Sequence, residues 1–534
     1  MKRENLLMIT GFSLLVIIFF IASLNIWRRS SNEEKPGQKI IRIAHWQLEP
    51  PVRKAFDKLA KIYMDEHPGV IIEVIAVPER TYSQWFMTRL VGGFAPDIIE
   101  MRTTDAAMIS RYFLPLTEWI EKPNPYNAGT ALADLSWRNT YIDGLDNDSA
   151  YHPQLLDYYG VPVSQFTNRF IYNRTLWREV LGNTPPPKTY AELVALCQRF
   201  TDEAKKTDRK VVPFLASIYH ATGVYQRLGG SQSQKLIEKL RGSPTQTIST
   251  NDFDLDYIRG DWSFDTPEMV AGLNIMRDVS TLFQSGYEAI SREDGVFKFL
   301  QGGALMIYTG SWDYGSFHDQ AAFELGVMDL PVPEPGSEGF GQYVAGLPSE
   351  GNVSTSASFS LARQSKYPEQ SVDFLQFLTS QRGNRLFAEA SGWLPAVIGV
   401  EPSEELKPFY PRLQGVRNGP ELTTLGQTNA GRVVASERYK LLGPTGSVDA
   451  YREGLKANLG DAIREDLKRS ALQQNKVVQR QDSILAAFSQ QLRTASDKTE
   501  KERLLRKLRE NEESQTLLET LNSWTTINLE APVR

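Results

Sequence analysis

The chain has 534 residues, of which 41% are hydrophobic and 23% are charged, and its formal net charge is −5. This length gives roughly two to three domains, and the composition argues against a globally disordered chain. The negative charge argues against a nucleic-acid-binding protein, which usually presents a basic face. A single cysteine, Cys197, excludes an intrachain disulfide, and its apolar neighbours predict a buried, inert thiol. No two of the five histidines are four residues apart, so we expect no metal centre and no cofactor.

The first element in chain order is an uncharged apolar segment, residues 6–24. At about 1.5 Å per residue a helix of this length is roughly 28 Å long, which is enough to cross a bilayer. We favour an uncleaved membrane anchor over a cleaved signal peptide, because residues 22–24 are a poor match to a cleavage site. Residues 1–38 are therefore predicted to be a transmembrane anchor followed by a polar tether.

From residue 39 onward, strand patterns and helix patterns alternate. This order predicts a largely parallel sheet covered by helices. The first predicted strands are 39–46, 70–78 and 96–101, and the helices between them are 50–69 and 81–93. Ligands on such sheets bind beyond the carboxyl ends of the strands. The loops 45–49 and 101–105 are therefore the first candidate binding positions.

The same alternation continues as far as residue 397. Thr189 and Glu192 form a capping-box signature at the start of one helix. Residues 304–307 form a short apolar strand between glycines, and Trp312 and Tyr314 follow it. Further strand and helix patterns lie in residues 158–180, 184–206, 266–286, 323–333 and 367–397.

The last part of the chain has a different pattern. Residues 450–521 contain no proline and few glycines, and leucines recur among charged residues and glutamines. This pattern predicts two long amphipathic helices joined near residues 494–502, as an antiparallel hairpin or a coiled coil. The irregular heptad phase favours a hairpin packed on the body.

Taken in order, these motifs resemble the extracellular solute-binding proteins of ABC importers that handle sugars and oligosaccharides. The most specific is "FLQGGALMIYTGSW", which is similar to the family run F-x-x-G-x-A-A-M-x-x-x-G-x-W. Neither the apolar N-terminal segment nor the C-terminal hairpin belongs to the usual family pattern. Eight other segments match in family order: "HPGVIIEV", "GGFAPDIIE", "FLPLTEWI", "YGVPV", "IYNRTLW", "PPPKTYAELV", "LGVMDLPVP" and "SKYPEQSVDFLQFLTS".

The resemblance implies an α/β clamp, the periplasmic-binding-protein fold, in which two discontinuous lobes close on a ligand. We expect the chain to cross between lobes near residues 158–163 and 351–356. The implied ligand is a carbohydrate and the implied partner is an ABC transporter permease. The protein would work on the extracytoplasmic face of the membrane, anchored by residues 6–24. The expected parts are 40–157 with 357–415 (first lobe), 158–356 with 416–465 (second lobe) and 466–534 (helical extension).

Trp312 is the leading candidate ligand contact, because it matches the sugar-stacking tryptophan of the family motif. A flat aromatic ring suits the apolar face of a sugar; the alternative is core or interlobe packing. Asp105 resembles a cleft carboxylate, with a helix N-cap as the alternative. Trp46 and Glu49, in the loop after the first strand, could bind ligand or pack at the strand end.

Five weaker candidates complete the expected site, and each could instead be a packing residue. The family often places an aromatic and a basic residue beside its cleft carboxylate, whereas this sequence has Met101, Arg102 and Ala106 there, so the ligand could differ from a simple maltodextrin. The weaker candidates are Tyr219, Tyr225, Trp85, Trp393 and Tyr314.

The predicted function is ligand binding without catalysis. The sequence has no G-x-S-x-G, P-loop, H-E-x-x-H or G-x-G-x-x-G motif. A clamp needs no nucleophile, only aromatic and hydrogen-bonding groups on both lobes. Two alternatives stay open: a carbohydrate-active enzyme with paired carboxylates, and a ligand-sensing receptor or adaptor whose hairpin docks a partner.

Overall fold

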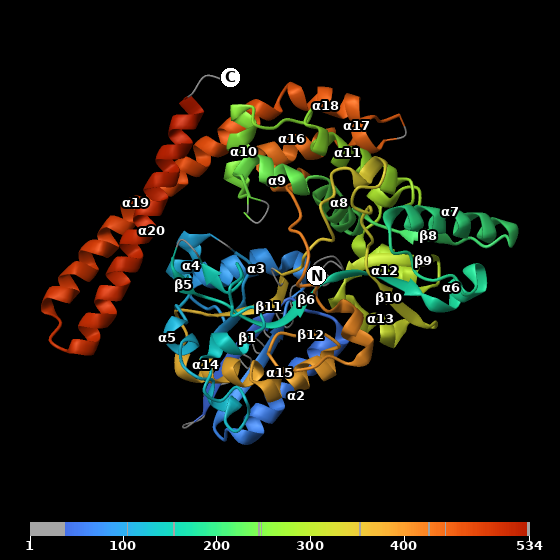
Figure 1. The fold of residues 1–534 in the computed structure, drawn as a ribbon. Helices are drawn as coiled ribbons and strands as arrows, with labels where there is room; N and C mark the ends of the chain where they lie inside the picture. The colour runs from blue at the N-terminus through green and yellow to red at the C-terminus, as the bar shows by residue number, and fades with distance from the viewer. Residues whose placement is uncertain are drawn as a thin grey trace, which may run out of the picture.

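The computed structural model describes residues 38–103, 105–152, 155–243, 246, 248–351, 354–425, 428–443 and 445–530. They form two α/β lobes and a long helical hairpin (Figure 1). The predicted membrane segment, residues 6–24, lies outside the described residues. Among the helices that are described, none combines the length and the apolar character needed to span a bilayer.

The first lobe is built on a six-stranded sheet in the order β12-β6-β11-β3-β1-β2. Strands β1, β2 and β3 are parallel, whereas β11, β6 and β12 pair in antiparallel fashion. One face packs on the helices around Phe56, and the other packs on the helices around Phe86. The strands are β1 (Lys39–His45), β2 (Val70–Ala76), β3 (Ile98–Glu100), β6 (Val161–Phe166), β11 (Ser354–Leu361) and β12 (Leu394–Pro395).

Helices cover both faces of this sheet, as the alternating pattern predicted. Pro50 and Pro368 each begin a helix, at the position where a missing N–H costs nothing. The covering helices are α2 (Pro50–Glu66), α14 (Pro368–Leu378) and α15 (Gln381–Ser391) on one face, and α3 (Glu79–Gly92) and α4 (Ala106–Tyr112) on the other. Shorter elements of this lobe are α5 (Thr117–Ile120), β4 (Tyr151–His152) and β5 (Asp157–Tyr158).

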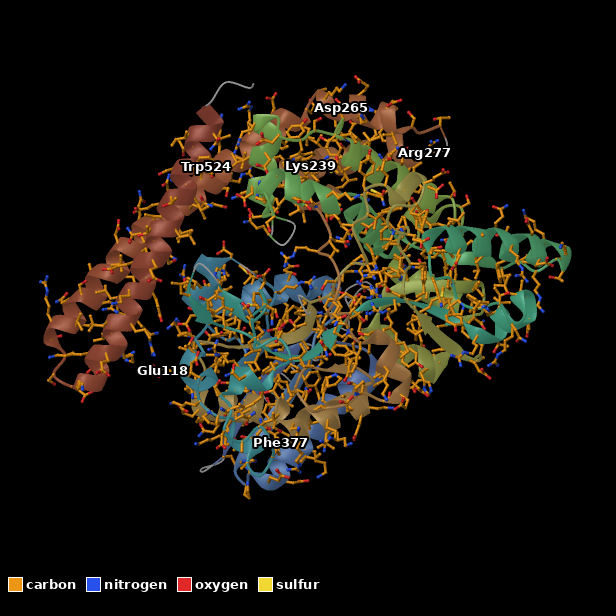
Figure 2. All side chains as sticks on the ribbon, in the orientation of Figure 1. Glu118, Lys239, Asp265, Arg277, Phe377 and Trp524 are labelled. Atoms are coloured by element: carbon orange, nitrogen blue, oxygen red, sulfur yellow. The ribbon has the colours of Figure 1, made fainter. Side chains whose placement is uncertain are left out.

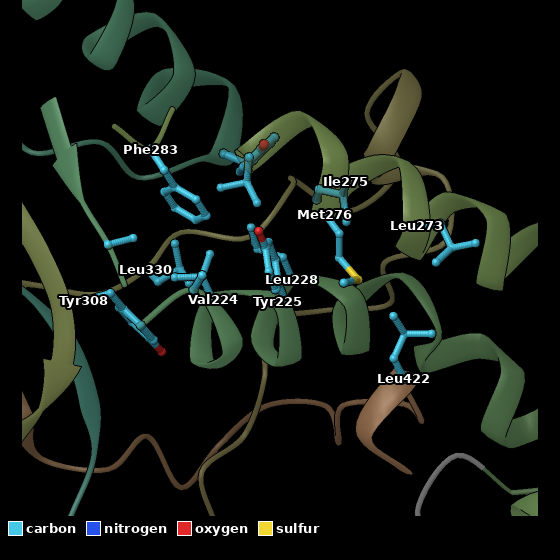
Figure 3. Packing of buried hydrophobic residues seen from close by; sticks show 14 of the residues in the cluster. Val224, Tyr225, Leu228, Leu273, Ile275, Met276, Phe283, Tyr308, Leu330 and Leu422 are labelled. Carbon is cyan, nitrogen blue, oxygen red and sulfur yellow. The ribbon is translucent and has the colours of Figure 1, made fainter. Parts of the chain in front are cut away.

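The second lobe contains a four-stranded sheet in the order β10-β7-β9-β8. Its larger core lies between this sheet and helices such as α8 and α11, where Tyr225 and Leu228 lie close to Met276 and Leu273 lies close to Leu422 (Figure 3). The strands are β7 (Asn168–Asn173), β8 (Val212–Leu215), β9 (Ala304–Gly310) and β10 (Leu325–Met328). The helices are α6 (Arg174–Leu181), α7 (Tyr190–Lys206), α8 (Ile218–Gln232), α9 (Gln234–Arg241), α10 (Thr250–Arg259), α11 (Pro267–Ser280), α12 (Arg292–Leu300), α13 (Tyr314–Gln320), α16 (Asn429–Glu437), α17 (Tyr439–Leu442) and α18 (Val448–Lys456).

The crossing between lobes corrects the predicted boundaries. Strand β6 belongs to the sheet of the first lobe and β7 to that of the second, so the chain crosses at Thr167 and not at 158–163. The chain returns through Glu350 into β11. The segment Glu404–Phe409, expected in the first lobe, packs its Leu406 and Phe409 into a core of the second lobe. Two consecutive extended segments, β6 and β7, do not reveal from their sequence alone which of two sheets each one joins.

Several local predictions are confirmed. Strand β9 contains the apolar run 304–307, and Thr189 caps α7 by accepting a hydrogen bond from the Glu192 amide (3.2 Å). The Glu192 carboxylate accepts from the Lys188 amide (2.7 Å), so the reciprocal half of the capping box is shifted by one residue. Cys197 is buried, and burial raises the pKa of its thiol to about 12.

The C-terminal hairpin is confirmed, with α19 (Leu459–Thr494) and α20 (Lys498–Glu530) joined at residues 495–497. The first turns of α19 insert Leu459, Ile463 and Leu467 into the core of the second lobe. The rest of the pair runs down one side of the molecule, drawn in red in Figure 1. Polar pairs cross the two helices, such as Gln515 with Asp482 (2.7 Å). An uninterrupted apolar seam is therefore not present, and the coiled-coil alternative is not supported.

Candidate ligand-binding cleft

A cavity of about 980 Å³ lies between the lobes, at the carboxyl ends of β1 and β3 and beside the crossing strands. Both lobes line it, and Phe166 at the crossing contributes as well. Its aromatic and charged lining residues are Trp46, Glu49, Glu79, Arg80 and Arg102 from the first lobe, Phe166 from the crossing, and Tyr219, Arg292, Glu293 and Trp312 from the second lobe.

The loop after β1 forms the first-lobe wall. The half-buried Trp46 ring lies edge-on to Tyr82 with centroids 4.9 Å apart, and the Arg102 guanidinium lies 5.0 Å from its centroid. Arg102 also pairs with Glu79 (3.3 Å). These contacts hold the indole in one orientation while one part of it faces the cavity.

Glu49 supplies a carboxyl group with spare hydrogen-bonding capacity in the same wall. Its Oε2 atom is buried and has no hydrogen-bond partner among the described residues. Burial raises the pKa of Glu49, and the nearby Asp313 carboxylate adds to the effect. A buried acceptor without a partner inside a cavity suits a ligand hydroxyl or N–H group.

The second-lobe wall is organised around Arg292, the first residue of α12. Its guanidinium donates to Asp313 Oδ1 (2.6 Å) and lies 5.4 Å from the centroid of the Tyr219 ring. Burial alone would lower the pKa of Arg292, but the Asp313 carboxylate outweighs it and the pKa is raised. Thr309 donates to the other oxygen of Asp313 (2.5 Å). Arg292 is thus a fixed cation beside an aromatic ring.

Trp312 lies at the end of β9, between the two walls. Its half-buried ring lies edge-on to Phe166 with centroids 4.8 Å apart, and its carbonyl accepts a hydrogen bond from Trp393 Nε1 (3.1 Å). A Cβ atom on Gly310 would overlap the Trp312 ring, so a glycine is required where the strand ends. This contact explains why glycine closes the apolar run of the motif.

The structure places four of the nine predicted contact residues on the cavity wall: Trp312, Trp46, Glu49 and Tyr219. Asp105 is not among the lining residues. It is exposed and caps α4, where its Oδ1 accepts from the Met108 amide (2.8 Å).

The other four predicted contacts are not among the residues that line this cavity, and each packs against other side chains. Tyr225 is buried in the core of the second lobe, where its hydroxyl bonds that of Tyr287 (2.7 Å) (Figure 3). Trp85 packs against Tyr82 on α3. Trp393 is buried in the first-lobe core and supports Trp312 from behind. Tyr314 lines a different cavity and packs on Phe409.

The lining residues that sequence reasoning did not propose as contacts include Gln47, Glu79, Phe166 and Arg292. Gln47 lies inside a loop that the strand-end rule had indicated. Arg292 is carried by a separate helix, and no spacing motif connects it to the cleft. Among the described residues, no group of three or more His, Cys, Asp and Glu side chains is arranged to hold a metal ion.

Two lobes joined by crossing strands, with a cavity lined from both sides, define a bilobed ligand-binding protein. Residues 58–411 match the family of bacterial extracellular solute-binding proteins, and the match spans more than half of the chain. The chain therefore belongs to this family, as the sequence motifs indicated.

Several solved structures share this fold, and the similarity covers nearly the whole length of each of them. Lmo0181 from Listeria monocytogenes in complex with cycloalternan is 18% identical with a TM-score of 0.53, covering 81% of this chain and 99% of its own. The GacH receptor of Streptomyces glaucescens, studied with acarbose, is 17% identical with a TM-score of 0.54. The similarity covers 80% of this chain and 98% of the GacH chain. RafE in complex with raffinose is 15% identical with a TM-score of 0.53, covering 80% and 100%; RafE is from Streptococcus pneumoniae. A comparison with curated proteins found no match.

Proposed function

We propose that this protein captures a carbohydrate between its lobes and delivers it to the permease of an ABC transporter, while residues 6–24 hold it at the extracytoplasmic face of the membrane. The observation that carries the proposal is the composition of the cavity wall. Trp46, Tyr219 and Trp312 offer flat aromatic surfaces, and Glu49 and Arg292 offer an acceptor and a donor between them. Sugars present apolar faces and polar edges, which this combination fits.

Two further observations support a sugar. Structures with this fold include complexes with raffinose and cycloalternan, and GacH was studied with acarbose. The cavity of about 980 Å³ lies at the upper end of the usual range for small-molecule sites, which favours an oligosaccharide over a single ring.

The mechanism needs only differential binding to two arrangements of the lobes. A ligand that touches Trp46 on one lobe and Tyr219 on the other stabilises the closed arrangement by the free energy of those contacts. The closed form would then be what a permease recognises. No covalent step is required, which agrees with membership of a family of binding proteins.

A receptor or adaptor role is the second candidate, and one observation favours it. The hairpin is rooted in the second lobe, yet Arg503 lies 3.7 Å from Glu118 of the first lobe and Lys507 lies 3.8 Å from Asp157. Because the hairpin contacts both lobes, lobe closure would move the hairpin or break these contacts, and a partner docked on the hairpin could respond to that change.

Calorimetry with the full-length protein tests the proposal, with raffinose, acarbose, cycloalternan and chitin oligosaccharides as ligands. We expect at least one to bind, and Trp312→Ala or Trp46→Ala to weaken it by about tenfold to a hundredfold, as loss of a buried aromatic anchor does. Trp524→Ala, a half-exposed tryptophan on the hairpin, is the matched control and should not change affinity.

Two results would contradict the proposal. Failure of every carbohydrate to bind, with an intact fold, would favour the receptor or adaptor role for another ligand. Release of a shortened sugar during incubation would establish an enzyme.

A further inference from the structure

Glu100, the last residue of β3, lies directly beneath the cleft and is fully buried. It is not among the residues that line the cavity. Its Oε2 accepts a hydrogen bond from the backbone N–H of Trp46 (3.1 Å), and its Oε1 accepts one from Nε2 of Gln47 (2.6 Å). Both carboxylate oxygens are thus committed to two consecutive residues of the binding loop.

The backbone of Glu100 reaches the same tryptophan by a second route. Its carbonyl accepts a hydrogen bond from the Tyr82 hydroxyl (2.8 Å), and the Tyr82 ring packs edge-on to Trp46. The Glu100 carboxylate therefore fixes the position of the Trp46 backbone. The Tyr82 ring, which the Glu100 carbonyl holds in place, fixes the tilt of the Trp46 ring. Burying a carboxylate without a hydrogen-bonded cation costs folding free energy, which indicates that Glu100 has a role other than stabilising the fold.

We propose that Glu100 is a positioning residue, whose carboxylate holds the Trp46–Glu49 loop in the geometry that binds ligand and whose protonation loosens that loop. The link to ligand affinity rests on the proposed function; the link to loop geometry does not. An ionised carboxylate accepts from both N–H groups, whereas the protonated acid turns one oxygen into an O–H donor, and one of the two hydrogen bonds is weakened.

The titration falls in an accessible range. Burial is the main cause that raises the pKa of Glu100 to about 8, while its hydrogen bonds with Gln47 and Trp46 oppose the rise. The loop is therefore held most firmly above pH 8. Four other ionisable groups lie around Glu100: Glu49 and Arg102 beside the cleft, Tyr82 on α3, and His45 at the end of β1.

Only one of these four can imitate the effect. Burial lowers the pKa of His45 to about 4 and raises that of Tyr82 well above its usual value, so neither group changes state between pH 6.5 and 9. Arginine side chains as a class do not titrate in this range. Burial also raises the pKa of Glu49, which is why a Glu49 variant is needed as a control.

Nuclear magnetic resonance of full-length protein labelled with ¹⁵N at tryptophan tests the geometry without any ligand. The backbone amide of Trp46 is identified with Trp46→Phe and followed from pH 6.5 to 9. We expect a titration with a midpoint near 8 in the native protein and in Glu49→Gln, and a flat response in Glu100→Gln. Asp97→Asn changes another buried carboxylate near the other end of β3, which binds the Arg42 amide (2.9 Å), and should leave the titration intact.

Raffinose, or whichever of the tested sugars binds most tightly, then links geometry to affinity. Its dissociation constant should fall severalfold from pH 6.5 to 9 in the native protein and stay constant in Glu100→Gln, which binds about tenfold more weakly at pH 9. A Trp46 signal that still titrates in Glu100→Gln, or never titrates in the native protein, would overturn the inference. If no sugar binds but Trp46 titrates as expected, the proposed function fails and the positioning role stands.

Discussion

At the scale of single residues, the buried histidine His45 sets a limit on acid stability. It is fully buried at the end of β1 and stacks on Phe56 with ring centroids 4.6 Å apart. Burial lowers the pKa of His45 to about 4, and the Gln47 backbone offsets this only in part. Because the unfolded chain takes up a proton near pH 6.5 and the folded chain does not, stability falls as the pH drops from about 6.5 to 4.

We predict that His45→Leu removes this part of the acid response. Leucine has a similar volume and no titrating group. Between pH 7 and pH 5, the free energy of unfolding of the variant should therefore fall by about 2 kcal/mol less than that of the native protein. Urea unfolding at the two pH values measures the difference. His318→Leu, at an exposed histidine, is the control; an acid response unchanged by His45→Leu would contradict the prediction.

The residue scale is also where sequence reasoning was least complete. An aspartate after a strand reads the same whether it faces a ligand or caps the next helix, and Asp105 caps α4. Tyr225 and Tyr219 lie on one helix only six residues apart, yet one is in the core and the other on the cavity wall. The direction of a side chain depends on how the helix packs, and loose spacing does not supply it. Glu100 was missed because a carboxylate inside an apolar strand has no motif.

At the scale of elements, a buried ion cluster braces the crossing strands. Arg169 on β7 makes a two-pronged pair with Glu350 (2.7 and 2.8 Å), and Arg227 on α8 joins Glu350 (3.1 Å) to Asp329 (2.9 Å). Arg412 also pairs with Asp329. The Arg169 hydrogen bonds outweigh burial and hold the pKa of Glu350 below its usual value. The network therefore lies beside both crossings, since Arg169 follows the crossing at Thr167 and Glu350 precedes β11.

We predict that Glu350→Gln destabilises the protein by about 2–3 kcal/mol, because it removes the carboxylate that holds the buried Arg169 by two hydrogen bonds and leaves only Asp329, 3.8 Å from the guanidinium, to offset the charge. The midpoint of urea unfolding measures this loss. Glu324→Gln is the matched control, since its pair with Arg178 is exposed on both sides and should contribute less than about 1 kcal/mol. Equal effects of the two variants would show that the cluster does not brace the crossing.

Sequence patterns predicted elements better than their assignment to lobes. The alternation of strand and helix, the proline starts and the apolar run of β9 each depend on local propensity, and all are found. The crossing point depends on which sheet has a free edge for β6, and that edge is formed by β11, almost two hundred residues later in the chain. Local pattern carries no record of such a distant partner.

At the scale of the whole molecule, the hairpin links both lobes. Its root is in the second-lobe core, and along its length Arg503 and Lys507 face Glu118 and Asp157 of the first lobe. Figure 2 labels Glu118 on the side of the first lobe that faces the hairpin. The Lys507–Asp157 pair is the less exposed of the two contacts, so it should hold the hairpin in place more firmly.

We predict that Lys507→Glu releases the hairpin from the first lobe, because it places a carboxylate beside Asp157. Spin labels are placed on the first lobe at Asp134→Cys and on the hairpin at Gln490→Cys. Double electron–electron resonance should then give a longer and broader distribution of label-to-label distances. The native Cys197 is buried and does not compete for label. Lys501→Glu makes the same charge change at an exposed lysine of α20 and should leave the distribution unchanged; an identical shift in both would contradict the prediction.

The connectivity of the two lobes also governs the order in which the protein can fold. The first-lobe sheet needs β1 from residue 39 and β12 from residue 395, and the second-lobe core needs residues from Phe170 to Leu467. Neither lobe can bury its core until most of the chain has emerged from the ribosome. The apolar faces of the early strands therefore stay exposed during synthesis. Folding of the two lobes depends on completion of the chain and cannot proceed one lobe at a time.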